Sequence, residues 1–377
     1  MRAIIMCGVL TVHTTTMLLS KMQDGSQAFL WGSAVHSTLH FTRMAFMFIT
    51  GLVLFITYYR RDFNTIIFWK KRFLLIAIPY VFWNIIYILY SGTYNGSFLS
   101  FLHIFGHSLA KGDQGYLYYV LVTFQFYIIF PILLFFLRKW EKWHVHVFII
   151  AFVFQLILMG YYKFFLPNMD TSAWPAVFKY IAGNYGVFVL TYESWFIAGG
   201  ILACHFDAVC AYIAKHSKAI YITLASSVVV MWGHYFFNRF VLNETDHKAQ
   251  MVEQPFFVPY SFVVIVFMLL ISMNWARKRE WPKWQPFSRF VMLASGCSFG
   301  MFLVQPIPLA LLKGVLKHIS GPSWLFYLLM PFSVLFVYLF SMVVAHWMGK
   351  IPLLSYCVGR RTSLPFKKTA REVIKNA

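Results

Sequence analysis

The chain begins with the stretch "MRAIIMCGVLTVHTTTM" (residues 1–17), which is apolar but carries an arginine at its start and a histidine in its body. Apolar runs of about 18 or more residues, the length that crosses the hydrocarbon core of a bilayer, recur along the rest of the sequence. An ionisable side chain inside such a run costs free energy and usually faces the interior of a helix bundle. The opening stretch therefore predicts a membrane helix whose ionisable side chains face the bundle interior and are candidates for a functional role.

Composition supports a membrane protein. Of 377 residues, 60% are hydrophobic and 12% charged, whereas soluble domains are about a quarter charged. We predict an all-α polytopic integral membrane protein, a bundle of about ten transmembrane helices, with residues 1–348 as the membrane domain and residues 349–377 as a basic cytoplasmic tail. The predicted spans are residues 3–20, 36–58, 73–91, 115–137, 145–163, 187–204, 217–236, 256–275, 290–312 and 323–348.

The distribution of basic residues predicts the orientation. The loops after spans two, four, six and eight, with the C-terminal tail, hold about 22 Lys and Arg, and the opposite loops hold about 8. Both termini are therefore expected in the cytoplasm of a multi-pass plasma-membrane protein, with the first span uncleaved. The net charge of +20 then favours contact with the anionic inner leaflet of the bilayer. Nucleic acid is not an expected partner, because the basic residues are scattered over short loops.

Ionisable residues within the predicted spans mark a polar interior. His13 lies about 15 Å along the first span; as an alternative to a functional role, it is a neutral imidazole bonded to a neighbouring helix. His36, His40 and Arg43 share one helix face at spacings of i, i+4 and i+7. Arg43 keeps its charge and needs water, a carboxylate or an anionic ligand. The histidine pair has zinc-compatible spacing but no third ligand, so we predict no metal site.

Glu193 is the one acidic residue that we place within a span. Three interpretations stay open: a counter-ion for Arg43, a partner that orients His13, or a hydrated group in a vestibule. Gln125 and Gln305 either line a polar cavity or bond neighbouring helices. A histidine accepts a proton from a hydroxyl nucleophile, and a nearby cation stabilises an oxyanion or holds a phosphate. The residues alone thus indicate a polar membrane cavity suited to acid–base chemistry.

Ordered motifs along the whole chain resemble those of the integral-membrane acyltransferase family three. Arg2 and His13 match its basic residue and histidine separated by ten residues. Similar motifs are "FMFITG" (46–51), "KKRFLLIAIPY" (70–80), "GYLYYVLVTFQFYIIFP" (115–131), "YESWFIAGG" (192–200) and "SGCSFGMFLVQP" (295–306). The chain looks most like the intercellular-adhesin biosynthesis C-type branch, which modifies or exports surface polysaccharide. Two positions depart from the family pattern: Leu75 replaces the second basic residue of an Arg-x-x-Arg motif that starts at Arg72, and Gln305 replaces a histidine.

The resemblance implies an O-acyltransferase that moves an acetyl or succinyl group from cytoplasmic acyl-CoA to a hydroxyl of a cell-surface polysaccharide. It implies that His13 is the general base, that Arg43 steadies the oxyanion or the donor, and that Glu193 orients the base. No resident cofactor is expected, because acyl-CoA is a co-substrate. The implied donor-binding residues are Arg2, Arg72, Lys70 and Lys71, and the implied acceptor-cavity residues are His36, His40, Gln125 and Gln305.

Two alternatives belong to other functional classes. In a polysaccharide exporter or flippase, the same cavity is a sugar passage and His13 binds without catalysing. Inverted repeats with broken helices would favour transport, and we find no such repeat in the sequence. In the other alternative the chain is an inactive scaffold within a polysaccharide synthase complex, which is a candidate partner under either interpretation.

Overall fold

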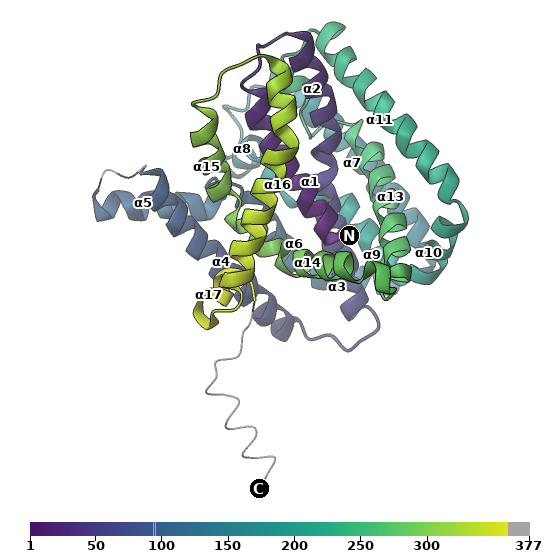
Figure 1. The fold of residues 1–377 in the computed structure, drawn as a ribbon. Helices are drawn as coiled ribbons and strands as arrows, with labels where there is room; N and C mark the ends of the chain where they lie inside the picture. Colours follow the sequence, from purple (N-terminus) through teal and green to yellow (C-terminus); the bar gives the residue numbers. More distant parts are fainter. Residues whose placement is uncertain (93, 95, 361–377) are drawn as a thin grey trace.

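The computed structural model describes residues 1–92, 94 and 96–360, and the regular structure in this part of the chain is helical, without strands. Within it, nine segments are long and apolar enough to cross a membrane, and a bent pair of helices makes up to ten. The predicted fold class is therefore confirmed (Figure 1). The long helices are α1 (Arg2–Leu19), α3 (Thr42–Tyr58), α4 (Thr65–Ser91), α6 (Tyr118–Lys139), α7 (His144–Gly160), α11 (Ser217–Phe240), α13 (Phe257–Lys278), α14 (Gln285–Val304) and α16 (Ser323–Met348).

Shorter helices connect and flank these spans. Figure 1 shows α5 projecting from one side of the bundle, beyond the end of α4. The shorter α-helices are α2 (Gln27–Ser37), α5 (Phe98–Lys111), α8 (Ala176–Gly183), α9 (Glu193–Cys204), α10 (Phe206–Lys215), α12 (Asp246–Ala249), α15 (Pro306–Leu316) and α17 (Pro352–Cys357). Tighter or wider turns are η1 (Thr38–Phe41), η2 (Glu141–Trp143), the π-helical η3 (Tyr161–Phe165), η4 (Leu166–Asn168), η5 (Tyr185–Val187), η6 (Val189–Tyr192) and η7 (Pro282–Trp284).

Three predicted spans differ in detail from the structure. The second begins earlier, because α2, η1 and α3 form one apolar segment from Gln27 to Tyr58. The sixth belongs to a pair of helices, Val189–Cys204 and Phe206–Lys215, bent by 96°. The ninth ends at Val304, where a break precedes α15. Pro306 opens α15, and proline is tolerated at a helix start because the N–H that it lacks would have no helical partner there.

The centre of the bundle is the close crossing of α3 and α9. Gly51 and Gly199 form this contact: a Cβ atom added at Gly51 would overlap the carbonyl oxygen of Phe196, and one added at Gly199 would overlap that of Phe48. Small residues permit this approach between membrane helices, where packing replaces the hydrophobic effect as the driving force. Helix α1 packs against α3, α14 and α16.

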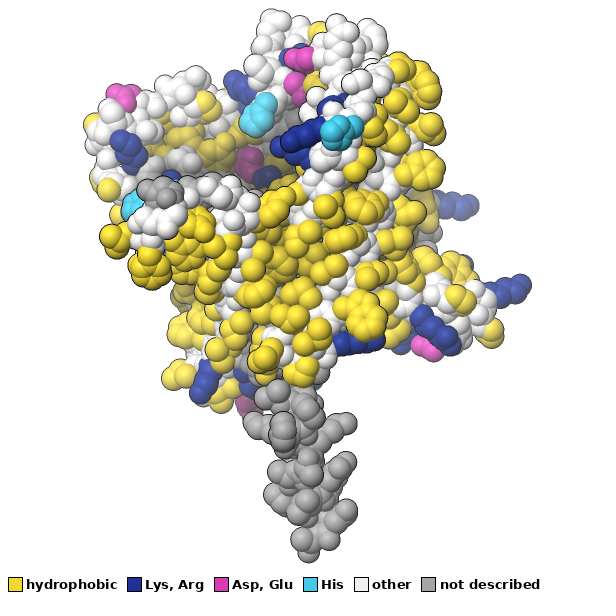
Figure 2. All heavy atoms as spheres, turned by 60° about the vertical axis from the view of Figure 1, so that its left-hand side comes forward, with side chains coloured by type: hydrophobic (Ala, Val, Ile, Leu, Met, Phe, Trp, Pro, Cys, Tyr) yellow, Lys and Arg dark blue, Asp and Glu magenta, His cyan; other side chains and the backbone are white. Residues whose placement is uncertain are grey.

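The surface has the polarity of a membrane protein. Figure 2 shows hydrophobic side chains over the middle of the visible face, charged side chains toward its ends, and a hollow near the upper end where basic, acidic and histidine side chains gather. The N-terminus of α1 and the C-terminus of α16 lie at the same end of the bundle (Figure 1). Their cytoplasmic orientation stays a prediction. Of the predicted tail, α17 and Arg360 pack onto the bundle, and residues 361–377 lie outside the described residues.

Candidate active site

Two cavities lie one after the other along α1. The first, which we call the arginine cavity, has a volume of about 280 Å³ and is lined by Arg2 at the start of the helix. The second, the histidine cavity, has a volume of about 80 Å³ and is lined by His13, three helical turns further on. Arg2 and His13 are eleven positions apart on the helix, a rise of about 16 Å. Helices α3, α6 and α14 each contribute residues to both cavities.

Three aromatic side chains line both cavities and form a partition between them: Phe46 from α3, Tyr119 from α6 and Phe302 from α14. The ring of Tyr119 lies 5.8 Å from that of Phe46 and 5.6 Å from that of Phe302, centroid to centroid. Its hydroxyl is buried beside Thr50, without a well-formed hydrogen bond to a described residue. Tyr119 thus adds a buried hydroxyl to the three side chains that the two cavities share.

His13 lines the histidine cavity. Its ring stacks on Tyr116, with 3.8 Å between centroids and 25° between planes. Among the described residues, neither ring nitrogen of His13 has a hydrogen-bond partner. The stack restrains the ring plane of the imidazole.

Arg43 lines the same cavity as His13, so the structure brings these two predicted residues together. Its guanidinium lies over the ring of Tyr118, 5.3 Å from the centroid. Its Nη1 donates a hydrogen bond to Oε1 of Glu253 at 3.1 Å. Sequence reasoning missed Glu253, because this residue lies in a loop between two spans. In the sequence, Glu253 lies three residues before the start of the predicted span 256–275.

Glu193 is not the counter-ion of Arg43, since Glu253 occupies that position. It is buried at the start of α9, and its Oε1 has no hydrogen-bond partner among the described residues. It is absent from the lining of both cavities and forms no bond to His13. The helix start offers free backbone N–H groups and a favourable dipole to a carboxylate, which is a structural reason for an acid at this position.

The loop of residues 241–256, which we call the strap, holds the predicted histidine pair. His36 Nδ1 lies 2.6 Å from Oε1 of Gln250, and its Nε2 lies 3.0 Å from Oγ1 of Thr16. His40 donates through Nδ1 to the Gln250 carbonyl oxygen at 3.0 Å. His40 lines the histidine cavity, whereas His36 does not. His36 therefore joins α1, α2 and the strap.

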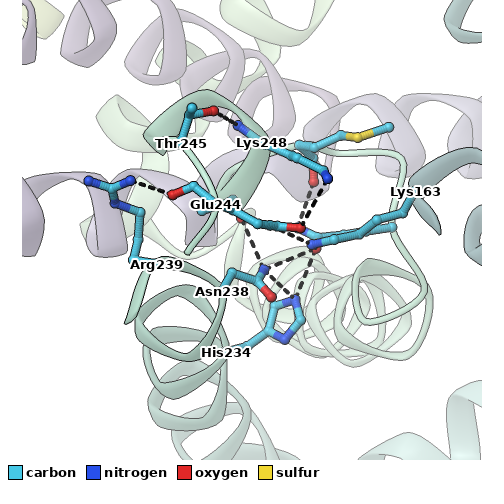
Figure 3. A network of polar contacts seen from close by, with 10 residues as sticks. Lys163, His234, Asn238, Arg239, Glu244, Thr245 and Lys248 are labelled. Atoms are coloured by element: carbon cyan, nitrogen blue, oxygen red, sulfur yellow. Dashed lines mark hydrogen bonds and ion pairs between the residues drawn. The ribbon is translucent and has the colours of Figure 1, made fainter. Parts of the chain in front are cut away.

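A buried polar network anchors the strap to α11 and to the end of the α7 segment (Figure 3). Lys163 Nζ lies 3.1 Å from Glu244 Oε2 and 2.5 Å from Gln254 Oε1. His234 and Asn238 on α11 contact the same Gln254 oxygen at 3.0 and 3.3 Å. The side chains of Lys163 and Glu244 are only 1% and 6% exposed. This network holds Gln254, the residue next to Glu253, and thereby positions the Glu253 carboxylate that Arg43 contacts.

Arg72 joins Arg2 in the arginine cavity, and a third arginine, Arg360, lines it as well. The guanidinium of Arg72 lies 5.7 Å from the ring centroid of Tyr58 and 6.0 Å from that of Tyr127. No acidic residue is among the described residues that line this cavity. The other two predicted donor-binding residues, Lys70 and Lys71, are exposed and outside the lining.

Both predicted glutamines lie outside the two cavities. Gln125 donates to the Val187 carbonyl at 2.7 Å and accepts from the Val189 N–H at 2.9 Å, so it ties the segment before α9 to α6. Gln305 is buried at the break between α14 and α15, and its amide has no hydrogen-bond partner among the described residues. Within the same residues, no group of three or more metal-ligating side chains lies together.

These features define a polytopic α-helical membrane protein with two cavities that share three lining residues, one with three arginines and one with a histidine and an arginine. Residues 1–345 match the family model described as "Acyltransferase domain", family three. The chain therefore belongs to acyltransferase family three and is a membrane acyltransferase. No curated protein and no solved structure matches the chain.

Proposed function

We propose that this protein is an O-acyltransferase that carries an acyl group, acetyl or succinyl, from acyl-CoA to a hydroxyl of a cell-surface polysaccharide. The donor enters the arginine cavity, where Arg2 and Arg72 contact its phosphates. Guanidinium groups suit this role because they remain charged and form paired hydrogen bonds to phosphate. The thioester then reaches the aromatic partition, and the acceptor hydroxyl enters the histidine cavity.

In the proposed reaction, His13 removes the proton of the acceptor hydroxyl as its oxygen attacks the thioester carbonyl carbon. A C–O bond forms, the C–S bond breaks, and the proton on His13 passes to the departing CoA thiolate, so the imidazole returns to its starting form. A positioned general base of this kind contributes about 10²- to 10⁴-fold to a rate. The stack on Tyr116 limits rotation of the imidazole during both proton transfers.

The carbonyl oxygen gains negative charge as the hydroxyl attacks. Arg43, in the same cavity as His13, supplies a permanent cation, and the Tyr119 hydroxyl supplies a hydrogen-bond donor at the partition. Loss of one donor to such an oxyanion typically costs about 10²- to 10³-fold in rate. Glu253 holds the Arg43 guanidinium and partly neutralises it before the donor arrives.

The observation that carries the proposal is the sharing of Phe46, Tyr119 and Phe302 by the two cavities. A donor with several negative charges fits the cavity with arginines, and an acceptor that must lose a proton fits the cavity with the free histidine. Among the described residues, these three side chains line both cavities, and in the proposal the acyl group passes directly from donor to acceptor between them, without an acyl-enzyme.

The test measures thiol release from acetyl-CoA and succinyl-CoA by the purified protein, with and without a polysaccharide acceptor. We expect acceptor-dependent release by the wild type and a loss of about 10²-fold or more in His13→Ala. His36→Ala is the comparison, because His36 lies outside the cavities and its loss is expected to reduce stability more than rate. Absence of turnover by the wild type with every donor and acceptor would favour an exporter and refute the proposal.

A further inference from the structure

Arg360 is the third arginine of the arginine cavity, and it lies beyond residues 1–345, the part of the chain that matches the family. It follows α17 and Gly359, after the last long helix, in what the sequence suggests is a simple basic tail. The structure instead places Val358, Gly359 and Arg360 in the cavity wall, together with Arg2 and Arg72. A segment outside the family match thus completes the cavity.

The position of Arg360 is built by several contacts. Trp83 on α4 donates through Nε1 to the Cys357 carbonyl oxygen at 2.9 Å, and the Arg360 N–H donates to the Ser355 carbonyl at 2.8 Å. Gly359 has a φ of 67°, a left-handed conformation that glycine adopts without strain. The chain therefore turns back at this point toward α14.

The guanidinium of Arg360 is held at one edge by α14. Its Nε donates to the Gly296 carbonyl oxygen at 3.2 Å, and its Nη2 lies 3.3 Å from Sγ of Cys297. Neither partner is a carboxylate, and no described acidic residue is within ion-pair distance of Arg360, Arg2 or Arg72. The side chain is oriented, but its charge is not neutralised by these contacts.

Three permanent cations in a cavity without an acidic lining residue favour a ligand with more than one negative charge. We propose that Arg360 is a donor-binding residue, whose guanidinium contacts a phosphate of the same ligand that Arg2 and Arg72 bind. The inference rests on the proposed function, in which this ligand is acyl-CoA. The same phosphate chemistry is present in the headgroup of an anionic phospholipid, so the experiment includes both sources.

The test uses the full-length protein in phosphatidylcholine nanodiscs and measures the affinity for coenzyme A of the wild type, Arg72→Ala, Arg360→Ala and Arg360→Lys. We expect Arg360→Ala to weaken binding roughly 10- to 100-fold, as for loss of a charged hydrogen bond, and Arg360→Lys to weaken it less. Lys350→Ala is the matched control: this cation lies over the ring of Trp347, 4.8 Å from the centroid, and outside the cavity lining. Its affinity is expected to equal that of the wild type.

The outcomes separate the two proposals. If the wild type does not bind coenzyme A, the donor assignment fails and this inference fails with it. If the wild type and Arg72→Ala behave as expected but Arg360→Ala binds like the wild type, only the role of Arg360 is overturned. The donor-binding role of Arg360 is also overturned if Arg360→Ala retains its affinity for coenzyme A but loses binding of phosphatidylglycerol added to the nanodiscs. In that case Arg360 binds a lipid headgroup. The Arg360→Lys variant, with a thermal unfolding curve for each protein, distinguishes loss of a phosphate contact from misfolding.

Discussion

The pair of Arg43 and Glu253 gives a prediction that does not depend on enzyme activity. The two groups lie 3.1 Å apart, with side chains 35% and 11% exposed. At that separation and an effective dielectric constant of about 20, the attraction is about 5 kcal/mol before desolvation is subtracted. Desolvation and the partial exposure of Arg43 offset most of it, which leaves a coupling free energy of about 1.5–3 kcal/mol, the usual range for a charged hydrogen bond.

A double-mutant cycle measures this coupling. The variants are Arg43→Gln, Glu253→Gln and the double variant, and the quantity is the free energy of unfolding in mixed micelles of a mild detergent and SDS. We expect the double variant to be more stable than the sum of the single effects predicts, by about 1.5–3 kcal/mol. The parallel cycle of Arg43→Gln with Glu193→Gln is the control, with an expected coupling within about 0.5 kcal/mol of zero.

Two results refute this reasoning. An additive cycle for Arg43 and Glu253 would show that the strap does not hold this arginine. A coupling in the cycle with Glu193 as large as that expected for Glu253 would show that the carboxylate within the span is the true partner. Either result would show that Glu253 does not hold Arg43 in the candidate site.

Three further predictions concern packing, the partition and the strap. Gly199→Ala is expected to lower the unfolding free energy by about 1–3 kcal/mol, because the added methyl group overpacks the crossing of α9 with α3. Gly233→Ala, with open space around the glycine, is expected to be neutral or stabilising. Equal effects of the two substitutions would contradict the close packing of α3 and α9. Tyr119→Phe is expected to lower the transfer rate by about 10²-fold at unchanged thermal stability, and Tyr260→Phe, outside both cavities, to leave the rate unchanged. Lys163→Met is expected to lower the unfolding free energy by about 3 kcal/mol, because it leaves the buried Glu244 carboxylate without its main partner. An unchanged unfolding curve would contradict the role of this network in anchoring the strap.

Local sequence pattern was sufficient to predict most of the membrane spans and one pair of polar residues that share a cavity. Hydrophobic length places α1 and α3 across the bilayer, and the rise of a helix then sets the depths of His13 and Arg43. Because the two helices run in opposite directions side by side, equal depths bring both residues to one cavity. The same calculation gave Glu193 a similar depth, but depth does not specify which face of a helix meets the cavity.

The remaining site residues depend on contacts between distant parts of the chain. Glu253 meets Arg43 across 210 positions, through a strap whose path depends on the buried network around Lys163. Arg360 reaches the arginine cavity because α17 packs against α4 and Gly359 turns the chain. Neither arrangement has a periodicity in the sequence, so both charges appeared as ordinary loop and tail residues.

The central claim is transfer between the two cavities, and the most direct measurement uses sealed membrane vesicles with the cytoplasmic face outward. Acyl-CoA with an isotopically labelled acyl group is added outside, the polysaccharide acceptor is enclosed inside, and the label on the acceptor is measured by mass spectrometry. The account predicts labelled acceptor inside vesicles with the wild-type protein and at least about 10²-fold less with His13→Ala. Equal labelling by the two proteins, or labelling only when donor and acceptor share one side, would contradict it.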